Sequence, residues 1–196
     1  MDNIIFIQEA LHSSVHRKDK GMIIKLDLAN AFDRVRNNFL FKVMENFGFA
    51  PSFINWIKDC IGSPWIAPLV NGQATKFFQA SRGLRQGCPL SPLLYAIQAS
   101  VLSYQLDHDQ SHNILLGLRI APEVKDINHT QFVDDTLLMG GASMPTTRKF
   151  KKELDAYTEV SGSVIRLTKS KIFGWNITPR EMLDISRILG MEGCTT

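Results

Sequence analysis

Three carboxylates lie where an apolar strand or a hairpin would normally exclude charge. Asp27 ends the apolar run that begins at Met22, and Asp134 and Asp135 stand together between two short apolar runs. A buried carboxylate destabilises the fold unless it is paired or bound to a metal ion. Two adjacent carboxylates also repel each other unless a cation lies beside them. These residue types therefore indicate a divalent-cation site formed by Asp27, Asp134 and Asp135.

Carboxylate ligands of this kind favour a specific chemistry. Oxygen ligands select a hard ion such as Mg²⁺ or Mn²⁺. In nucleotidyl transfer, carboxylates hold two such ions about 4 Å apart; one activates the attacking 3′-hydroxyl and the other stabilises the pyrophosphate leaving group. Each acidic segment alone has a simpler explanation, because Asp is common in turns and caps. Their combination favours the two-metal site.

A loop between the two acidic segments adds phosphate-binding potential. Residues 81–92 contain Gly83, Gly87, two prolines, Arg82 and Arg85. Glycine lets a backbone approach a ligand closely, and arginine binds phosphate. A purely structural connector is the alternative, and the composition of the loop makes it the weaker one.

Helices and strands must bring these segments together. Apolar residues at helical spacing predict helices over 3–16, 37–47, 51–61, 92–106, 145–160 and 179–189. Ser91 is the expected cap of the fourth helix, Gly162 ends the fifth with Lys149 facing outward, and Thr178 with Glu181 forms a capping box for the last. Residues 108–113 are expected to form a polar turn.

Apolar runs predict the strands. They are expected over 22–28, 115–120 and 171–175, in a hairpin around Asn71-Gly72, and in a second hairpin over 129–140 that carries both adjacent acids at its tip. Strands and helices do not alternate strictly. The predicted fold is therefore α+β, with an antiparallel sheet backed by helices.

Composition bounds the class of protein. The chain has 196 residues, of which 44% are hydrophobic, so it can form one domain with a core or two small lobes. A net charge of +3 permits nucleic-acid binding but does not select for it. The three cysteines show neither metal-ligand spacing nor a disulfide framework. No apolar window reaches the ~18 residues of a membrane span, and no signal peptide is recognised, so no membrane partner is expected.

Three motifs, in this order, resemble those of a known family. KLDLANAFDRV, RGLRQGCPLSPLL and FVDDTLL are similar to the palm motifs of reverse transcriptases, particularly those of non-LTR (LINE-type) retrotransposons in plant genomes. The resemblance covers nearly the whole chain. It implies a palm-type antiparallel sheet within a right-hand polymerase architecture and an RNA-directed DNA polymerase that uses Mg²⁺ or Mn²⁺. The implied partners are an RNA template, a DNA primer and dNTPs.

The resemblance also implies roles for single residues. Asp27 and Asp134 match the principal metal ligands and Asp135 a supporting one, while Leu28 would contribute its backbone carbonyl to a metal. Phe32 matches the aromatic residue under the incoming sugar, whose ring excludes a 2′-hydroxyl; the alternative is an ordinary core residue.

Further matches lie in the loop and after the last motif. Gln86 and Gly87 match the contact to the incoming nucleotide and template base. Arg82 and Arg85 would support that loop or bind a backbone phosphate. Lys169 matches a lysine that protonates the leaving pyrophosphate, with a simple solvated lysine as the alternative.

The chain departs from the family pattern at two places. Val133 replaces the small residue that usually precedes the paired acids. Val164, Ile165 and Arg166 stand where the family often has Lys-Ile-Asn, which affects the expected geometry around Lys169.

The resemblance assigns the chain to one partial reverse transcriptase domain. Residues 1–21 would end the fingers, 22–175 would form the palm core with inserted finger elements, and 176–196 would lead towards the primer grip and thumb. The upstream fingers, the thumb and the endonuclease are expected to be missing, and a nuclear location is implied by the resemblance alone.

Three alternatives to an active reverse transcriptase remain open. The chain could be an inactive retrotransposon remnant that at most binds nucleic acid. It could be an RNA-dependent RNA polymerase, although Phe32 and Val133 disfavour that class. A structural interaction protein would leave the three acids unexplained.

Overall fold

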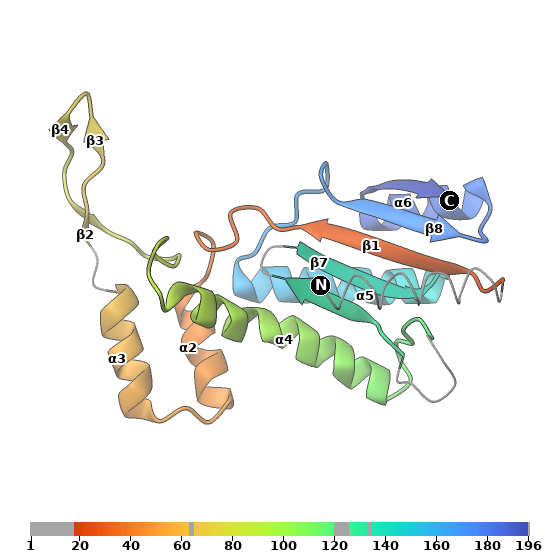
Figure 1. Cartoon of the computed structure of the whole chain (residues 1–196), viewed down its shortest axis with the longest axis horizontal. Coiled ribbons are helices and arrows are strands. Elements are labelled where there is room, and N and C mark those ends of the chain that lie inside the picture. The colour runs from red at the N-terminus through yellow and green to blue at the C-terminus, as the bar shows by residue number, and fades with distance from the viewer. Residues whose placement is uncertain (1–17, 63–64, 120–125, 133–134, 196) are drawn as a thin grey trace.

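A five-stranded sheet forms the centre of the molecule. The computed structural model describes residues 18–62, 65–119, 126–132 and 135–195 (Figure 1). The strand order is β6-β7-β1-β8-β9. Neighbouring strands are antiparallel except β8 and β9, which are parallel. The strands are β1 (Gly21–Asp27), β6 (His129–Phe132), β7 (Asp135–Gly141), β8 (Lys171–Trp175) and β9 (Glu192–Thr195). The predicted antiparallel sheet is confirmed, with β9 as an unpredicted parallel edge strand.

Helices cover one face of this sheet. Met22, Ile24 and Leu26 alternate along β1 and are almost fully buried against residues of α4, α5 and α6. Such alternation is what a strand with one packed face requires. The helices are α2 (Asn37–Asn46), α3 (Pro51–Gly62), α4 (Ser91–Ser111), α5 (Met144–Ser161) and α6 (Pro179–Leu189). The predicted α+β architecture is therefore confirmed.

The ends of α5 and α6 agree with the sequence signals. Gly162 ends α5 with a φ of 81°, and Gly190 ends α6 with a φ of 72°. These left-handed conformations favour glycine because it has no Cβ. Thr178 and Glu181 form the predicted capping box at the start of α6. Both ends of α6 are thus defined by residues close to them in the sequence.

A hairpin arm extends from the body of the molecule. We call residues 65–79 the arm; it contains β2 (Trp65–Ile66), β3 (Leu69–Val70), β4 (Gln73–Ala74) and β5 (Phe78–Gln79). Strands β2 and β5 pair, as do β3 and β4, in two short antiparallel ladders. Asn71 and Gly72 have φ values of 52° and 80°, which confirms the predicted tight turn. Figure 1 shows the arm standing away from the sheet.

Helix α4 differs from its predicted form at both ends. Ser91 does not cap it; its hydroxyl donates to the Arg85 carbonyl at 2.6 Å, and the N-cap residue is Leu90. The helix also continues to Ser111, so the predicted polar turn at 108–113 is wrong over its first half. Polar residues in this last turn are buried in tertiary contacts that a local pattern does not reveal.

Two other local predictions are wrong. Between residues 115 and 119 there is no strand, only an isolated bridge from Leu118 to Ile127. Lys149 does not face solvent freely, because it forms ion pairs with two buried acids.

The helix predicted over 3–16 lies outside the described residues. Among the residues that the structure describes, no helix is long and apolar enough to cross a membrane.

Candidate active site

The end of β1 and the start of β7 bring two of the predicted acids together. In the antiparallel register, Asp27 lies directly opposite Asp135. Directly opposed residues on neighbouring strands point to the same face, with Cβ atoms about 5 Å apart. Because Leu26 and Thr136, the preceding opposed pair, face the helices, Asp27 and Asp135 lie on the face that the helices leave open.

The backbone of Asp27 is held by the segment that precedes β8. Its N–H donates to Ser170 Oγ at 3.1 Å, and its carbonyl accepts from the Arg166 N–H at 2.9 Å. Leu28 continues this contact through a bridge to Ile165. The Leu28 carbonyl accepts no hydrogen bond from the described residues. The strand end that carries Asp27 is therefore clamped between β7 and the 163–170 segment.

One carboxylate oxygen of Asp27 is suited to metal binding. Oδ1 is buried and receives no hydrogen bond from the described residues. Arg166 Nε lies 3.7 Å from it, an ion-pair distance that is too long for a hydrogen bond. A desolvated anionic oxygen of this kind is a favourable ligand for a hard divalent cation.

The acid on β7 has a more open environment. The Lys25 Nζ atom lies 3.7 Å from Asp135 Oδ1, and both side chains are about half exposed. Asp134 and Val133 lie outside the described residues. Within the part of the chain that the structure describes, no three acidic, histidine or cysteine side chains gather into a metal-binding group. The described half of the site is thus the pair Asp27 and Asp135.

Two clefts share Phe32 and Gln86, and one of them has Asp27 in its wall. One, of about 270 Å³, includes Asp27, Leu28, Asn30 and Arg166 in its wall. The other, of about 490 Å³, is lined also by Gly87, Cys88, Pro89 and Pro92. The half-buried Phe32 ring packs against Tyr95 with ring centroids 5.0 Å apart. Phe32 therefore packs on α4 and also lines both clefts, a position that suits either role considered for it.

The glycine-rich loop is fixed against the segment after β1. Gln86 Nε2 donates to Asp33 Oδ1 at 3.2 Å, and the Leu84 N–H donates to the Phe32 carbonyl at 2.8 Å. Asp33 therefore links the segment after β1 to this loop. Gly87 has a φ of 83° and open space where a Cβ would lie. The loop thus places Gln86 and Gly87 in the wall of the 490 Å³ cleft.

The two loop arginines lie on the side towards the arm. Arg82 and Arg85 line a third cleft of about 680 Å³ together with Trp65, Gln86 and Asp33. Both arginines are exposed. Their position is compatible with either role that the sequence left open, loop support or phosphate contact.

Lys169 lies in the segment that precedes β8, with its side chain in solvent. It is in the turn between Arg166 and Ser170, and its N–H donates to the Arg166 carbonyl at 3.0 Å. Its side chain is exposed and has no ionic partner among the described residues. The structure therefore places it near the clamped end of β1 without bringing it into contact with Asp27.

Comparison with known proteins gives the family. A model of the reverse transcriptase (RNA-dependent DNA polymerase) family matches residues 2–187. The chain belongs to this family. Its resemblance to reverse transcriptases of non-LTR retrotransposons is confirmed as well.

Two relatives show how much of a longer protein this chain spans. The transposon TX1 uncharacterized 149 kDa protein of Xenopus laevis is 32% identical over 169 residues, 86% of this chain but 12% of the relative. The Pol polyprotein from type-1 retrotransposable element R2 of Popillia japonica is 30% identical over 140 residues, 70% of this chain and 22% of the relative. The chain thus corresponds to a small part of each relative's length.

A solved structure shares the reverse transcriptase fold described above. Apo telomerase from Candida tropicalis, truncated from its C-terminal domain, superposes with a TM-score of 0.67 over 91% of this chain and 36% of that chain. The sequences are 15% identical, so this similarity concerns the fold. The palm-type architecture expected from the sequence is therefore confirmed.

Sequence reasoning missed three residues around the acids. Lys25 contacts Asp135, Ser170 accepts from the backbone of Asp27, and Arg166 contacts Asp27 directly. Lys25 could have been found, because it lies two positions before Asp27 and so on the same face of β1. Arg166 was visible only as a departure from the family pattern, and its contact required the fold.

Proposed function

We propose that this chain carries the nucleotidyl-transfer site of an RNA-directed DNA polymerase. The observation that carries the proposal is the register of β1 and β7, which sets Asp27 opposite Asp135 on the open face of the sheet. Acids distant in sequence thereby share one site. Residues 22–175 would act as the palm core with inserted finger elements, flanked by 1–21 from the fingers and 176–196 towards the thumb.

The residues present suit the divalent cations that this family uses. Asp27, with its buried and unbonded Oδ1, Asp135, and Asp134 beside it in the sequence would hold Mg²⁺ or Mn²⁺, and the Leu28 carbonyl would complete the oxygen ligands. Bound ions of this kind activate a primer 3′-hydroxyl and stabilise the charge on the leaving pyrophosphate. Lys169 would supply a proton to that pyrophosphate after turning from solvent.

The two clefts that meet at Phe32 and Gln86 suit the parts of a dNTP. The backbone N–H groups of Asn30, Ala31 and Phe32 have no hydrogen-bond partner among the described residues. Consecutive free N–H groups next to a left-handed residue, here Asn30 with a φ of 48°, favour an anion such as a triphosphate. The sugar would rest on Phe32, which favours deoxyribose. The base would occupy the cleft of about 490 Å³.

The remaining loop residues would meet the template. Gln86 and Gly87 would contact the base pair that forms, since both line the larger cleft. Arg82 would bind a backbone phosphate in the cleft towards the arm. The partners of the site would be an RNA template, a DNA primer and dNTPs.

Primer extension on an RNA template tests this function. With a primed RNA template, dNTPs and Mg²⁺, Asp27→Asn and Asp134→Asn should each lower the extension rate about a thousandfold, because the cations lose a charged ligand. Asp155→Asn is a matched control, since Asp155 is an exposed acid on α5 that pairs with Lys151. Equal extension by Asp27→Asn and the parent would exclude the proposed site. A parent that extends no primer would instead favour an inactive retrotransposon remnant.

A further inference from the structure

Arg166 connects the acid site to the smaller cleft. Its Nε lies 3.7 Å from Asp27 Oδ1, and its Nη2 donates to Asn30 Oδ1 at 3.0 Å. The same side chain lines the 270 Å³ cleft with Phe32 and Gln86. It is about one third exposed, so it has room to move. A guanidinium thus lies within reach of both a proposed metal ligand and the proposed triphosphate cleft.

Each described acid of the site faces a cationic side chain before any ion binds. Asp27 faces Arg166 and Asp135 faces Lys25, each at 3.7 Å. A divalent cation on Asp27 would therefore approach a guanidinium, and like charges at a few ångströms destabilise each other. An anion that arrives with the cation removes this repulsion. Metal binding to this chain should thus depend on what else enters the cleft.

The contact between Arg166 and Asp27 is weak enough to exchange. At 3.7 Å it is not a hydrogen bond, and partly exposed ion pairs contribute little to stability. Arginine binds phosphate oxygens through charge-assisted, often paired hydrogen bonds, which are stronger. A triphosphate in the cleft would therefore compete favourably for the guanidinium.

We propose that Arg166 is a nucleotide-binding residue that exchanges partners. It neutralises Asp27 in the free protein and turns to the triphosphate of the incoming dNTP when divalent cations occupy the acids. This inference rests on the proposed polymerase function and adds a coupling between cation and nucleotide. Arg166 stands where the family often has Asn, so Arg166→Asn is the informative substitution.

Binding measurements without primer or template test the exchange, because no chemistry then occurs. The apparent Kd for Mg²⁺, alone and with dTTP, and the Kd for dTTP at saturating Mg²⁺ are measured on the full chain by calorimetry or by the shift in Tm. Arg166→Asn should tighten Mg²⁺ alone by a few-fold, since the competing cation is gone. It should weaken dTTP about tenfold or more, since a charged hydrogen bond to phosphate is lost.

Two further variants separate this role from a structural one. Arg166→Lys keeps the charge, so it should leave the affinity for Mg²⁺ alone at the parent value and weaken dTTP less than Arg166→Asn. Arg187→Asn, in an exposed i,i+3 pair with Asp184 on α6, should change neither affinity. A merely structural Arg166 would instead shift both affinities in the same direction or not at all.

The outcomes also distinguish this inference from the proposed function. If Asp27→Asn abolishes the Mg²⁺ response but Arg166→Asn leaves both affinities unchanged, the exchange is excluded and the metal site stands. If Arg166→Asn weakens Mg²⁺ alone, the exchange is likewise excluded. If the parent shows no response to Mg²⁺, or Asp27→Asn retains the full response, the metal site and the exchange fail together.

Discussion

The sheet with its helices and the arm have similar apolar residues in opposite environments. In the body, Phe150 and Leu138 are fully buried between the sheet and the helices. In the arm, Phe77 is 67% exposed and Leu69 is 71% exposed. Figure 1 shows the arm projecting from the end of α3, away from the five strands. The folding free energy from apolar burial is therefore concentrated in the body.

This contrast explains how the candidate site is held. Asp27 and Asp135 occupy fixed register positions on strands whose other face is packed, and a slip of one residue would turn the packed side chains outward. The arm has only short ladders of two residue pairs each. The geometry of the acids should therefore tolerate changes in the arm, and the predictions below test that separation.

The largest difference is expected from the same substitution made in both regions. Phe150→Ala should lower the free energy of unfolding by about 3 to 5 kcal/mol, because it leaves a cavity under the sheet. Phe77→Ala should change it by no more than about 0.5 kcal/mol. Urea unfolding followed by circular dichroism measures both. Comparable losses for the two variants would mean that the arm is packed against the body in solution.

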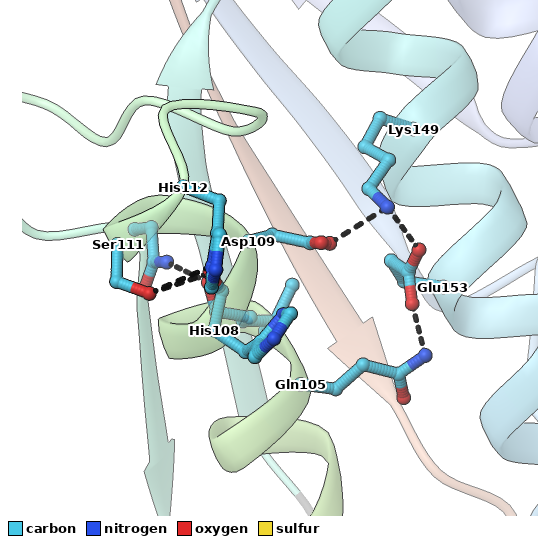
Figure 2. Close-up of polar contacts among 9 residues, drawn as sticks. Gln105, His108, Asp109, Ser111, His112, Lys149 and Glu153 are labelled. Atoms are coloured by element: carbon cyan, nitrogen blue, oxygen red, sulfur yellow. Dashed lines mark hydrogen bonds and ion pairs between the residues drawn. The ribbon is translucent and has the colours of Figure 1, made fainter.

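The second prediction concerns how much the buried polar side chains of the body contribute to stability. Lys149 on α5 lies 2.9 Å from Asp109 Oδ2 and 2.6 Å from Glu153 Oε1, and both acids are almost fully buried. Gln105 of α4 donates to the second oxygen of Glu153, and Figure 2 shows the four side chains bridging the two helices. Desolvation acts to lower the pKa of Lys149, but the hydrogen bonds to Glu153 and Asp109 outweigh it and raise the pKa.

Removing Lys149 should lower the free energy of unfolding, because Asp109 and Glu153 would lose this cationic partner while buried. Lys149→Met should lower the stability at pH 7 by about 2 to 3 kcal/mol, slightly less than for a fully buried pair because Lys149 is partly exposed. Lys151→Met is the matched control, since Lys151 pairs with Asp155 four residues on, and both side chains are exposed. Its effect should stay below about 0.5 kcal/mol. Equal effects in urea unfolding would show that the network contributes no more than a surface pair.

The same network shows where the sequence was insufficient. The polar residues after Leu106 indicate a turn by composition, yet Asp109 and Gln110 are buried in α4. Asp109 meets Lys149, and Gln110 Nε2 donates to the Asp126 carbonyl at 2.6 Å. These partners lie far along the chain, so no local pattern reveals them.

Other features were predictable because their causes are local. The apolar run of β1, the Asn71-Gly72 turn and the capping box of α6 each depend on neighbouring residues. The pairing of Asp27 with Asp135 was expected from the family motifs rather than from periodicity. The contact of Arg166 with Asp27 could not be expected, because it depends on how the 163–170 segment folds back along β1.

The smallest effect is expected at an exposed edge of the body and concerns pH. The hydrogen bond from Lys20, at 2.6 Å, and those from Thr178 lower the pKa of Glu181 from 4.5 to about 2. Because the folded-state pKa is the lower one, this contribution to stability is complete above the unfolded pKa near 4.5. It is lost as the pH falls through that range towards about 2.

The Tm difference between the parent and Glu181→Gln should therefore be small and constant near pH 7 and shrink below pH 4.5. Because the change removes Lys20's partner at the protein surface, the difference should also decrease with added salt. A difference that persists undiminished at pH 2 would mean that the capping geometry, and not the charge of Glu181, stabilises the start of α6.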